Sequence, residues 1–346
     1  MGNNLYTPAG WLDFNYIADR DAWLNIIIGA RQVGKTYGVL KYVLDNNIQH
    51  VLLRRTTAEL DTITASPEIS PYKVFEPEYK TGIFRQAKKL CKICDYTIDE
   101  NGKTQLLTQR GIATSLAEIS HIRGFAGGTF TDLIFDEFIP EKSIITRSTE
   151  GDAFLNAYTT INSNRELDGR PPLRAWLLAN SNRVDSPILE ALDLTDIILY
   201  MRRKDIEEYQ TEDGALVIQP KSTGILTQRA ETALMKRVNS KSEFYGMAIE
   251  NDFSYDQSPY IKTLPLKNMV PEWSYNNIYC WSYSGGYYIC RAPFKSANAR
   301  TYDPTRTGRE SLAIDWPILK AYYYAGMIAF SDLRALSLFK QIFDIV

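Results

Sequence analysis

The stretch that most constrains this chain is residues 24–36, where an apolar run leads into a glycine-containing loop and then into a helical pattern. The loop reads Gly29-Ala30-Arg31-Gln32-Val33-Gly34-Lys35-Thr36, which has the G-x-x-x-x-G-K-T spacing of a phosphate-binding loop (P-loop). The two glycines permit close approach of the backbone, and the loop N–H groups and the helix N-terminus together form a cradle for anions. The stretch therefore predicts a nucleotide site, in which Lys35 reaches the β- and γ-phosphates and Thr36 ligates Mg²⁺.

A second apolar run, residues 131–138, contains two adjacent acids, Asp136 and Glu137. A P-loop enzyme needs a carboxylate at the tip of a strand that neighbours the P-loop strand, where it holds Mg²⁺ through water. Asp136 fits this role, and Glu137 fits the role of the group that polarises the attacking water. The Asp-Glu pair favours ATP hydrolysis over phosphate transfer to a small molecule, and the alternative is an exposed acidic strand end.

Asn180 follows a third apolar run, residues 174–179. A polar residue at this strand tip can sense the γ-phosphate, and the alternative is a turn-forming Asn-Ser-Asn. Arg31 either adds a cation beside the phosphates or pairs with a surface acid. Hydrolysis also needs a cation for the transition state, which a neighbouring subunit can supply. The candidates are four arginines in predicted loops, each of which is alternatively an ordinary surface residue: Arg123, Arg147, Arg165 and Arg170.

Composition excludes several classes of protein. The 346 residues are 45% apolar and 23% charged, which is typical of a globular protein of about two domains. The net charge of −2 gives the whole chain no nucleic-acid signature, although basic residues outnumber acidic ones in residues 255–346. Four cysteines make no disulfide framework, two histidines offer no metal set, and no apolar run has membrane-spanning length. A reducing cytoplasm is the expected compartment.

Strands and helices alternate through residues 24–201, which predicts a parallel sheet with helices on both faces. The expected strands are 24–28, 50–54, 112–116, 131–138, 174–179 and 196–201, and the main helices are 35–46 and 150–163. We assign residues 1–201 to an ATPase domain, 202–254 to a charged linker subdomain and 255–346 to a C-terminal domain. The last of these is expected to hold an aromatic hairpin at 278–291, a polar loop at 296–310 and helices at 316–328 and 331–344.

The motifs together resemble one family, the genome-packaging ATPases of small short-tailed bacteriophages, which are relatives of the large terminase subunits. The motifs recur there in this order and at similar spacing. They are Ile28 to Tyr37, Leu53-Arg54-Arg55 with Glu59-Leu60, Ile134 to Lys142, Asn164-Arg165-Glu166 and Leu178 to Asn182. The resemblance covers the ATPase part well and continues more weakly to the end of the chain.

This resemblance implies an ASCE-type (RecA-like) P-loop ATPase that uses ATP and Mg²⁺ to drive double-stranded DNA into a procapsid. The ATPase would form a homo-oligomeric ring, expected to be a pentamer, at the portal vertex in the cytoplasm of the infected host. By motif, Lys35 and Thr36 take the Walker A roles, Asp136 and Glu137 the Walker B roles, and Asn180 the coupling role. Arg123 and Arg165 lie in regions that match family positions for a residue acting on the neighbouring subunit's site.

Terminase relatives carry a C-terminal RNase H-like nuclease, whose metals need a cluster of acids. The hairpin 278–290 has no Asp or Glu, and the later acids are scattered, so the resemblance implies an α+β nuclease fold without nuclease chemistry. Such a domain is expected to contact DNA, the portal or a structural RNA, and the alternative is a solvated polar surface. The rival functions are a terminase that also cuts DNA, a nucleotide-gated scaffold without turnover and, least expected, a small-molecule kinase.

Overall fold

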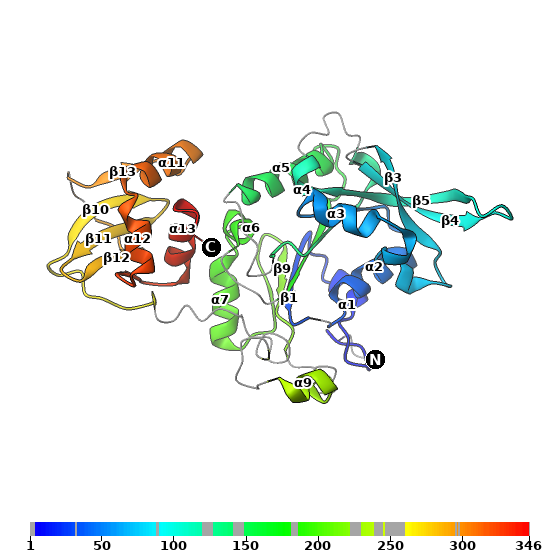
Figure 1. The fold of residues 1–346 in the computed structure, drawn as a ribbon, viewed down its shortest axis with the longest axis horizontal. Helices are drawn as coiled ribbons and strands as arrows, with labels where there is room; N and C mark the ends of the chain where they lie inside the picture. The colour runs from blue at the N-terminus through cyan, green and yellow to red at the C-terminus, as the bar shows by residue number, and fades with distance from the viewer. Residues whose placement is uncertain are drawn as a thin grey trace. The chain divides into compact units, whose positions relative to one another are not determined.

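The computed structural model describes residues 4–31, 33–87, 90–119, 127–140, 149–180, 186–221, 230–238, 245, 260–294, 296 and 298–345 (Figure 1). The chain divides into two compact units. Unit 1 comprises Met1–Glu141, Asp152–Asn182 and Ile197–Ser254, and unit 2 comprises Lys142–Gly151, Arg183–Asp196 and Tyr255–Val346. Unit 2 thus includes two short segments, Lys142–Gly151 and Arg183–Asp196, that precede its C-terminal part in the sequence.

Unit 1 is built on a nine-stranded sheet in the order β3-β4-β5-β2-β6-β7-β1-β9-β8. The neighbours from β5 to β9 pair in parallel, and the edge strands β3, β4 and β8 pair antiparallel. The bounds are β1 Leu24–Gly29, β2 His50–Arg54, β3 Thr81–Ala87, β4 Leu90–Ile98, β5 Thr104–Ser115, β6 Asp132–Asp136, β7 Arg174–Asn180, β8 Glu208–Gln210 and β9 Ala215–Ile218. The expected α/β fold with a large, mostly parallel sheet is confirmed.

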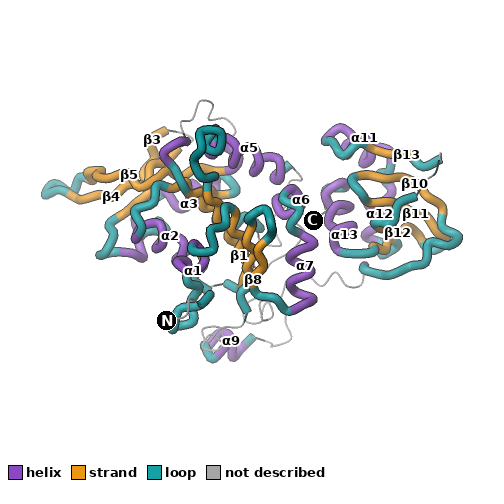
Figure 2. Tube along the Cα trace, turned by 180° about the vertical axis from the view of Figure 1, so that it is seen from behind, coloured by secondary structure: helices purple, strands orange, loops and turns teal. Residues whose placement is uncertain are grey.

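Helices and 3-10 turns connect these strands. They are α1 Phe14–Ala18, α2 Lys35–Asp45, α3 Thr57–Thr64, η1 Pro67–Ile69, η2 Lys73–Phe75, α4 Leu116–Ile119, η3 Gly127–Thr129, α5 Glu150–Asn162, α6 Pro187–Ala191, α7 Thr195–Lys204 and α9 Ala233–Arg237. Helices α1 and α2 lie side by side (Figure 2). The buried Trp176 on β7 packs against Phe14 and Tyr42, with ring centroids 5.7 Å apart in both pairs. The P-loop helix α2 is thereby packed against both the N-terminal segment and the sheet.

The predicted strand at 196–201 is wrong, because these residues lie in helix α7. A short apolar run does not distinguish a buried strand from a helix with one buried face. Ile198 and Met201 are fully buried at helical spacing, whereas Tyr200 between them is 40% exposed. Residues 208–218, which the sequence analysis placed in the linker, form β8 and β9 at the edge of the unit 1 sheet, next to β1.

Unit 2 contains a five-stranded sheet in the order β13-β10-β11-β12-β14. Its elements are β10 Val270–Tyr275, β11 Ile278–Tyr283, β12 Gly286–Cys290, β13 Arg300–Tyr302, α11 Arg306–Asp315, α12 Ile318–Tyr324, β14 Ile328–Phe330 and α13 Leu333–Ile342. The expected hairpin and the last helix are confirmed as β11–β12 and α13. The polar loop and the helix 316–328 are wrong in part: β13 and α11 occupy the former, and Gly326, at φ 71°, separates α12 from β14.

One apolar core unites the sheet of unit 2 with its helices, through residues such as Trp273, Leu319, Phe330 and Phe339, all of them fully buried. In the part of the chain that the structure describes, no helix has both the length and the apolar character needed to span a membrane.

Candidate nucleotide site

The P-loop joins the carboxyl end of β1 to the first turn of α2. Gly34 is the residue before the helix and has φ 85°, in the left-handed region that a glycine adopts without strain. A Cβ atom on Gly34 would lie 3.0 Å from the ring of Trp11, so a larger residue here would also have to displace that ring slightly. Gln32 lies outside the described residues. The strand–loop–helix context predicted for the motif is therefore present.

Lys35 is the centre of this loop. Its side chain is buried, and its ammonium Nζ donates to the carbonyl oxygens of Gly29 at 2.9 Å and Ala30 at 2.7 Å. A third bond, 3.2 Å long, reaches Oδ1 of Asn180 at the end of β7. Gly29 and Asn180 are paired in register between β1 and β7, which explains why the strand tips meet. The predicted Walker A lysine and the predicted coupling residue are thus in direct contact.

Thr36 contacts the first of the two acids, because its hydroxyl donates to Oδ1 of Asp136 over 2.9 Å. The sequence analysis assumed that the strand of Asp136 is the direct neighbour of the P-loop strand. This assumption is wrong, because one strand separates them. β7 lies between β1 and β6, and it is Thr36, in the first turn of α2, that reaches Asp136. A hydroxyl and a carboxylate are oxygen ligands of the kind that Mg²⁺ prefers, and Mg²⁺ commonly takes only one or two protein carboxylates beside substrate phosphates. These residues therefore fit the metal role assigned to them.

Glu137, the second acid, has an unusual backbone conformation. It has φ 59°, the left-handed conformation, which costs a non-glycine residue about 1–2 kcal/mol and tends to persist at functional sites. Its side chain is 57% exposed and its Oε2 lies 3.4 Å from Nη1 of Arg54. The same Nη1 lies 3.2 Å from Oδ2 of Asp136. One guanidinium therefore holds both acids at the carboxyl end of β6.

Arg54 contacts both acids of the candidate site, although the sequence analysis named it only within a family motif and not among the site residues. Its side chain is only 10% exposed and it ends β2, the strand next to β6. The available signal was its position, since the carboxyl ends of parallel strands meet at one edge of a sheet. The sequence alone does not tell which of Arg54 and Arg55 turns toward the acids. In the structure, Arg55 pairs with Glu59 instead, at 3.4 Å.

The candidate arginines in the predicted loops differ in where the structure places them. Arg123 and Arg147 lie outside the described residues. Arg165 is buried, and its guanidinium donates to the carbonyls of Pro171 and Phe130 at 3.0 and 2.9 Å. Phe130 precedes β6, whereas Asp136 ends it, and a strand of that length spans about 13 Å. Arg165 is therefore at the opposite edge of the sheet from its own chain's Lys35 and Asp136.

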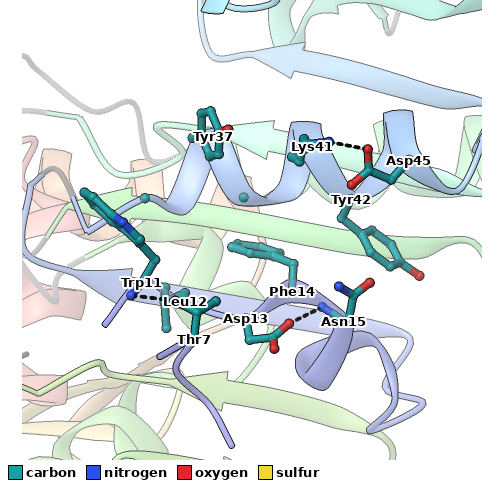
Figure 3. Close-up of a pocket in the computed structure, with 12 residues that line it drawn as sticks. Thr7, Trp11, Leu12, Asp13, Phe14, Asn15, Tyr37, Lys41, Tyr42 and Asp45 are labelled. Carbon is teal, nitrogen blue, oxygen red and sulfur yellow. Dashed lines mark hydrogen bonds and ion pairs between the residues drawn. The ribbon is translucent and has the colours of Figure 1, made fainter. Parts of the chain in front are cut away.

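A pocket of about 570 Å³ adjoins the P-loop (Figure 3). It lies between α2 and the N-terminal segment, and its walls include Trp11, Phe14, Tyr37 and Tyr42. Figure 3 shows Trp11 beside the N-terminal end of α2 and Phe14 beside its middle. The pocket reaches Gly34 and Tyr37, the residues that flank Lys35 and Thr36, so an apolar cavity begins where the phosphate loop ends.

Comparison with known proteins finds similarity to phage DNA packaging proteins. Two curated relatives, both named DNA packaging protein and found in the Bacillus phages phi29 and PZA, are each 23% identical to this chain over 264 residues. The match covers 74% of this chain and 68% of each relative. The solved structure of the Phi-28 gp11 DNA packaging motor is 18% identical over 98% of both chains and superposes with a TM-score of 0.63, which shows a common fold. No family model matches the chain. The resemblance to bacteriophage genome-packaging ATPases that the motifs indicated is therefore confirmed.

Proposed function

We propose that the chain is an ATP-driven motor that moves double-stranded DNA into a viral procapsid. The observation that carries the proposal is the contact set at the sheet edge, in which Lys35 meets Asn180 and Thr36 meets Asp136. This set brings the groups needed to hold phosphates and a divalent metal together with Asn180, the proposed sensor of the γ-phosphate. The link between such a site and DNA comes from the relatives that are named DNA packaging protein.

Each residue has a distinct part in the proposed reaction. Lys35 and the N–H groups of Gly29 to Gly34 would bind the β- and γ-phosphates of ATP, and Thr36 and Asp136 would hold Mg²⁺. The metal would draw charge from the phosphates. Glu137 would orient the attacking water and accept its proton, after it leaves Arg54. Asn180, bonded to Lys35, would respond when the γ-phosphate arrives or departs.

The pocket beside the P-loop would take the base of the nucleotide. An aromatic N-terminal segment can pack against the base of a nucleotide or only at the edge of the core. The cavity between Trp11 and α2 favours the first reading, because a flat aromatic base suits an aromatic, largely apolar wall. Trp11 is 43% exposed and Tyr37 is 52% exposed, so both rings offer surface for such a contact.

A homo-oligomeric ring, which we expect to be a pentamer at the portal, would complete each site. Arg165 lies at the far edge of the sheet from its own chain's Lys35, so it would act on a neighbouring chain's site, after exchanging the carbonyls of Pro171 and Phe130 for that partner. Arg123 remains the second candidate. Unit 2 would be a nuclease-like domain that contacts DNA, the portal or a structural RNA.

The decisive experiment measures phosphate release and DNA packaging into procapsids for the wild type, Lys35→Ala and Glu137→Gln. Both substitutions should lower ATP turnover by roughly 10²-fold or more, because each removes a group acting on the reacting phosphate or water. Lys73→Ala is the matched control, since this half-exposed lysine pairs only locally, with Glu76 at 2.8 Å. Normal turnover by Lys35→Ala would overturn the site.

The rival functions predict other outcomes of the same measurements. Binding of ATP without phosphate release by the wild type would point to a scaffold. Nicking of DNA in the presence of Mn²⁺ would point to an active nuclease. Turnover without any binding of duplex DNA would contradict the motor.

A further inference from the structure

Arg334 on α13 is surrounded by acids from one short segment of unit 2. Its Nε lies 3.2 Å from Glu190, its Nη2 lies 2.9 Å from Asp193, and its Nη1 lies 3.2 Å from Asp196. All three guanidinium nitrogens therefore face a carboxylate. Such use of the planar fork is specific to arginine, because an ammonium is a single point of charge.

A second arginine reinforces this cluster. Arg291 lies 2.7 Å from Asp196 and 3.2 Å from Asp332, whose carboxylate also accepts the backbone N–H of Ala335 and so caps α13. The side chain of Glu190 is only 8% exposed. Burial raises the pKa of this carboxyl, and the Arg334 guanidinium acts in the opposite direction. The segment from Glu190 to Asp196 is thereby tied to the start of α13.

The same segment begins ten residues after Asn180 in the chain. Asn180, which bonds to Lys35, ends β7 in unit 1, and the chain enters unit 2 at Arg183. It returns to unit 1 after Asp196. Few residues thus separate a side chain that touches the phosphate-binding lysine from acids that are clamped by α13.

We propose that Arg334 is a coupling residue that anchors the segment from Glu190 to Asp196 to α13, so that a change at Asn180, earlier in the chain, alters unit 2. The proposal rests on the proposed function, because it assumes that nucleotide occupies the Lys35 site. Arg334 touches none of the reacting groups, so it acts by position and not in catalysis. A purely structural role would lower stability in Arg334 variants but would leave the response of α13 to nucleotide intact.

The test compares wild type, Arg334→Gln, Arg334→Lys and the control Arg306→Gln. Arg306 is 73% exposed on α11 and pairs with Glu310 one turn away, so its loss removes an arginine of unit 2 without touching the cluster. The readouts are hydrogen exchange of α13 amides with and without a non-hydrolysable ATP analogue, ATP turnover without DNA, and base pairs packaged per ATP.

We expect wild type and Arg306→Gln to change α13 exchange on adding the analogue. In Arg334→Gln this change, and the DNA packaged per ATP, should fall at least about fivefold, the low end of an ordinary coupling factor, while basal turnover stays unchanged. Both quantities should also fall in Arg334→Lys, and this variant replaces the glutamine variant in the test if the latter does not fold. A full α13 response in either folded Arg334 variant, or an equal loss in Arg306→Gln, would overturn the proposal. Absence of turnover in the wild type would instead refute the proposed function.

Discussion

His50 provides a stability prediction that follows directly from the structure. It begins β2 and is fully buried, with Nδ1 donating to the carbonyl of Ile48 at 3.0 Å and Nε2 accepting from the Tyr72 hydroxyl at 2.6 Å. Burial lowers the pKa of the imidazole from 6.5 to about 4, against the opposing effect of the Ile48 carbonyl. The folded chain therefore keeps His50 neutral at a pH at which the unfolded chain has protonated it.

The sign and size of the effect follow from proton linkage. Between pH 6.5 and about 4 the unfolded state binds one more proton than the folded state, so folding stability falls as the pH falls through this window. At about 1.4 kcal/mol for each pKa unit, the full loss of folding stability is on the order of 3 kcal/mol. Above the unfolded pKa of 6.5, His50 is neutral in both states and no stability is lost.

The assay is urea unfolding of the wild type, His50→Gln and Tyr72→Phe at several pH values from 7.5 to 4.5. His50→Gln removes the titrating group, so its stability should depend less on pH than that of the wild type. Tyr72→Phe keeps the buried imidazole and should retain the dependence, although it loses a hydrogen bond worth about 1 kcal/mol. Equal pH dependence in wild type and His50→Gln would refute the reasoning.

Three further outcomes are expected. Arg54→Ala leaves the buried carboxylate of Asp136 without its guanidinium, which should cost about 3–5 kcal/mol, and thermal unfolding should show that added Mg²⁺ recovers more stability in this variant than in the wild type. Gly38→Ala places a Cβ 2.3 Å from the Phe14 ring, so urea unfolding should show a loss of about 1–3 kcal/mol; an unchanged midpoint would contradict the packing. Trp11→Ala should raise the KM for ATP more than it lowers kcat, measured by phosphate release, and an unchanged KM would separate Trp11 from the base.

The sequence was sufficient where a local pattern has a single physical meaning. The spacing from Gly29 to Thr36 predicts the strand, the loop and the helix, because backbone approach and anion binding both depend on residues adjacent in the chain. The positions of Asp136 and Asn180 at the candidate site were also predictable. Each ends a buried parallel strand, and the carboxyl ends of such strands gather at one edge.

Tertiary structure decided what depends on partners distant in the chain. The position of β7 between β1 and β6 is set by packing of whole strands, and it determines that Lys35 meets Asn180 while Thr36 reaches Asp136. The helix at 195–204 follows from burial on one face, which an apolar run does not reveal. Arg54 became part of the site, and Arg165 a buried donor to backbone carbonyls, only through the surroundings that folding gave them. A long, flexible arginine side chain acquires its role from the nearest acceptors, and these are known only once the chain has folded.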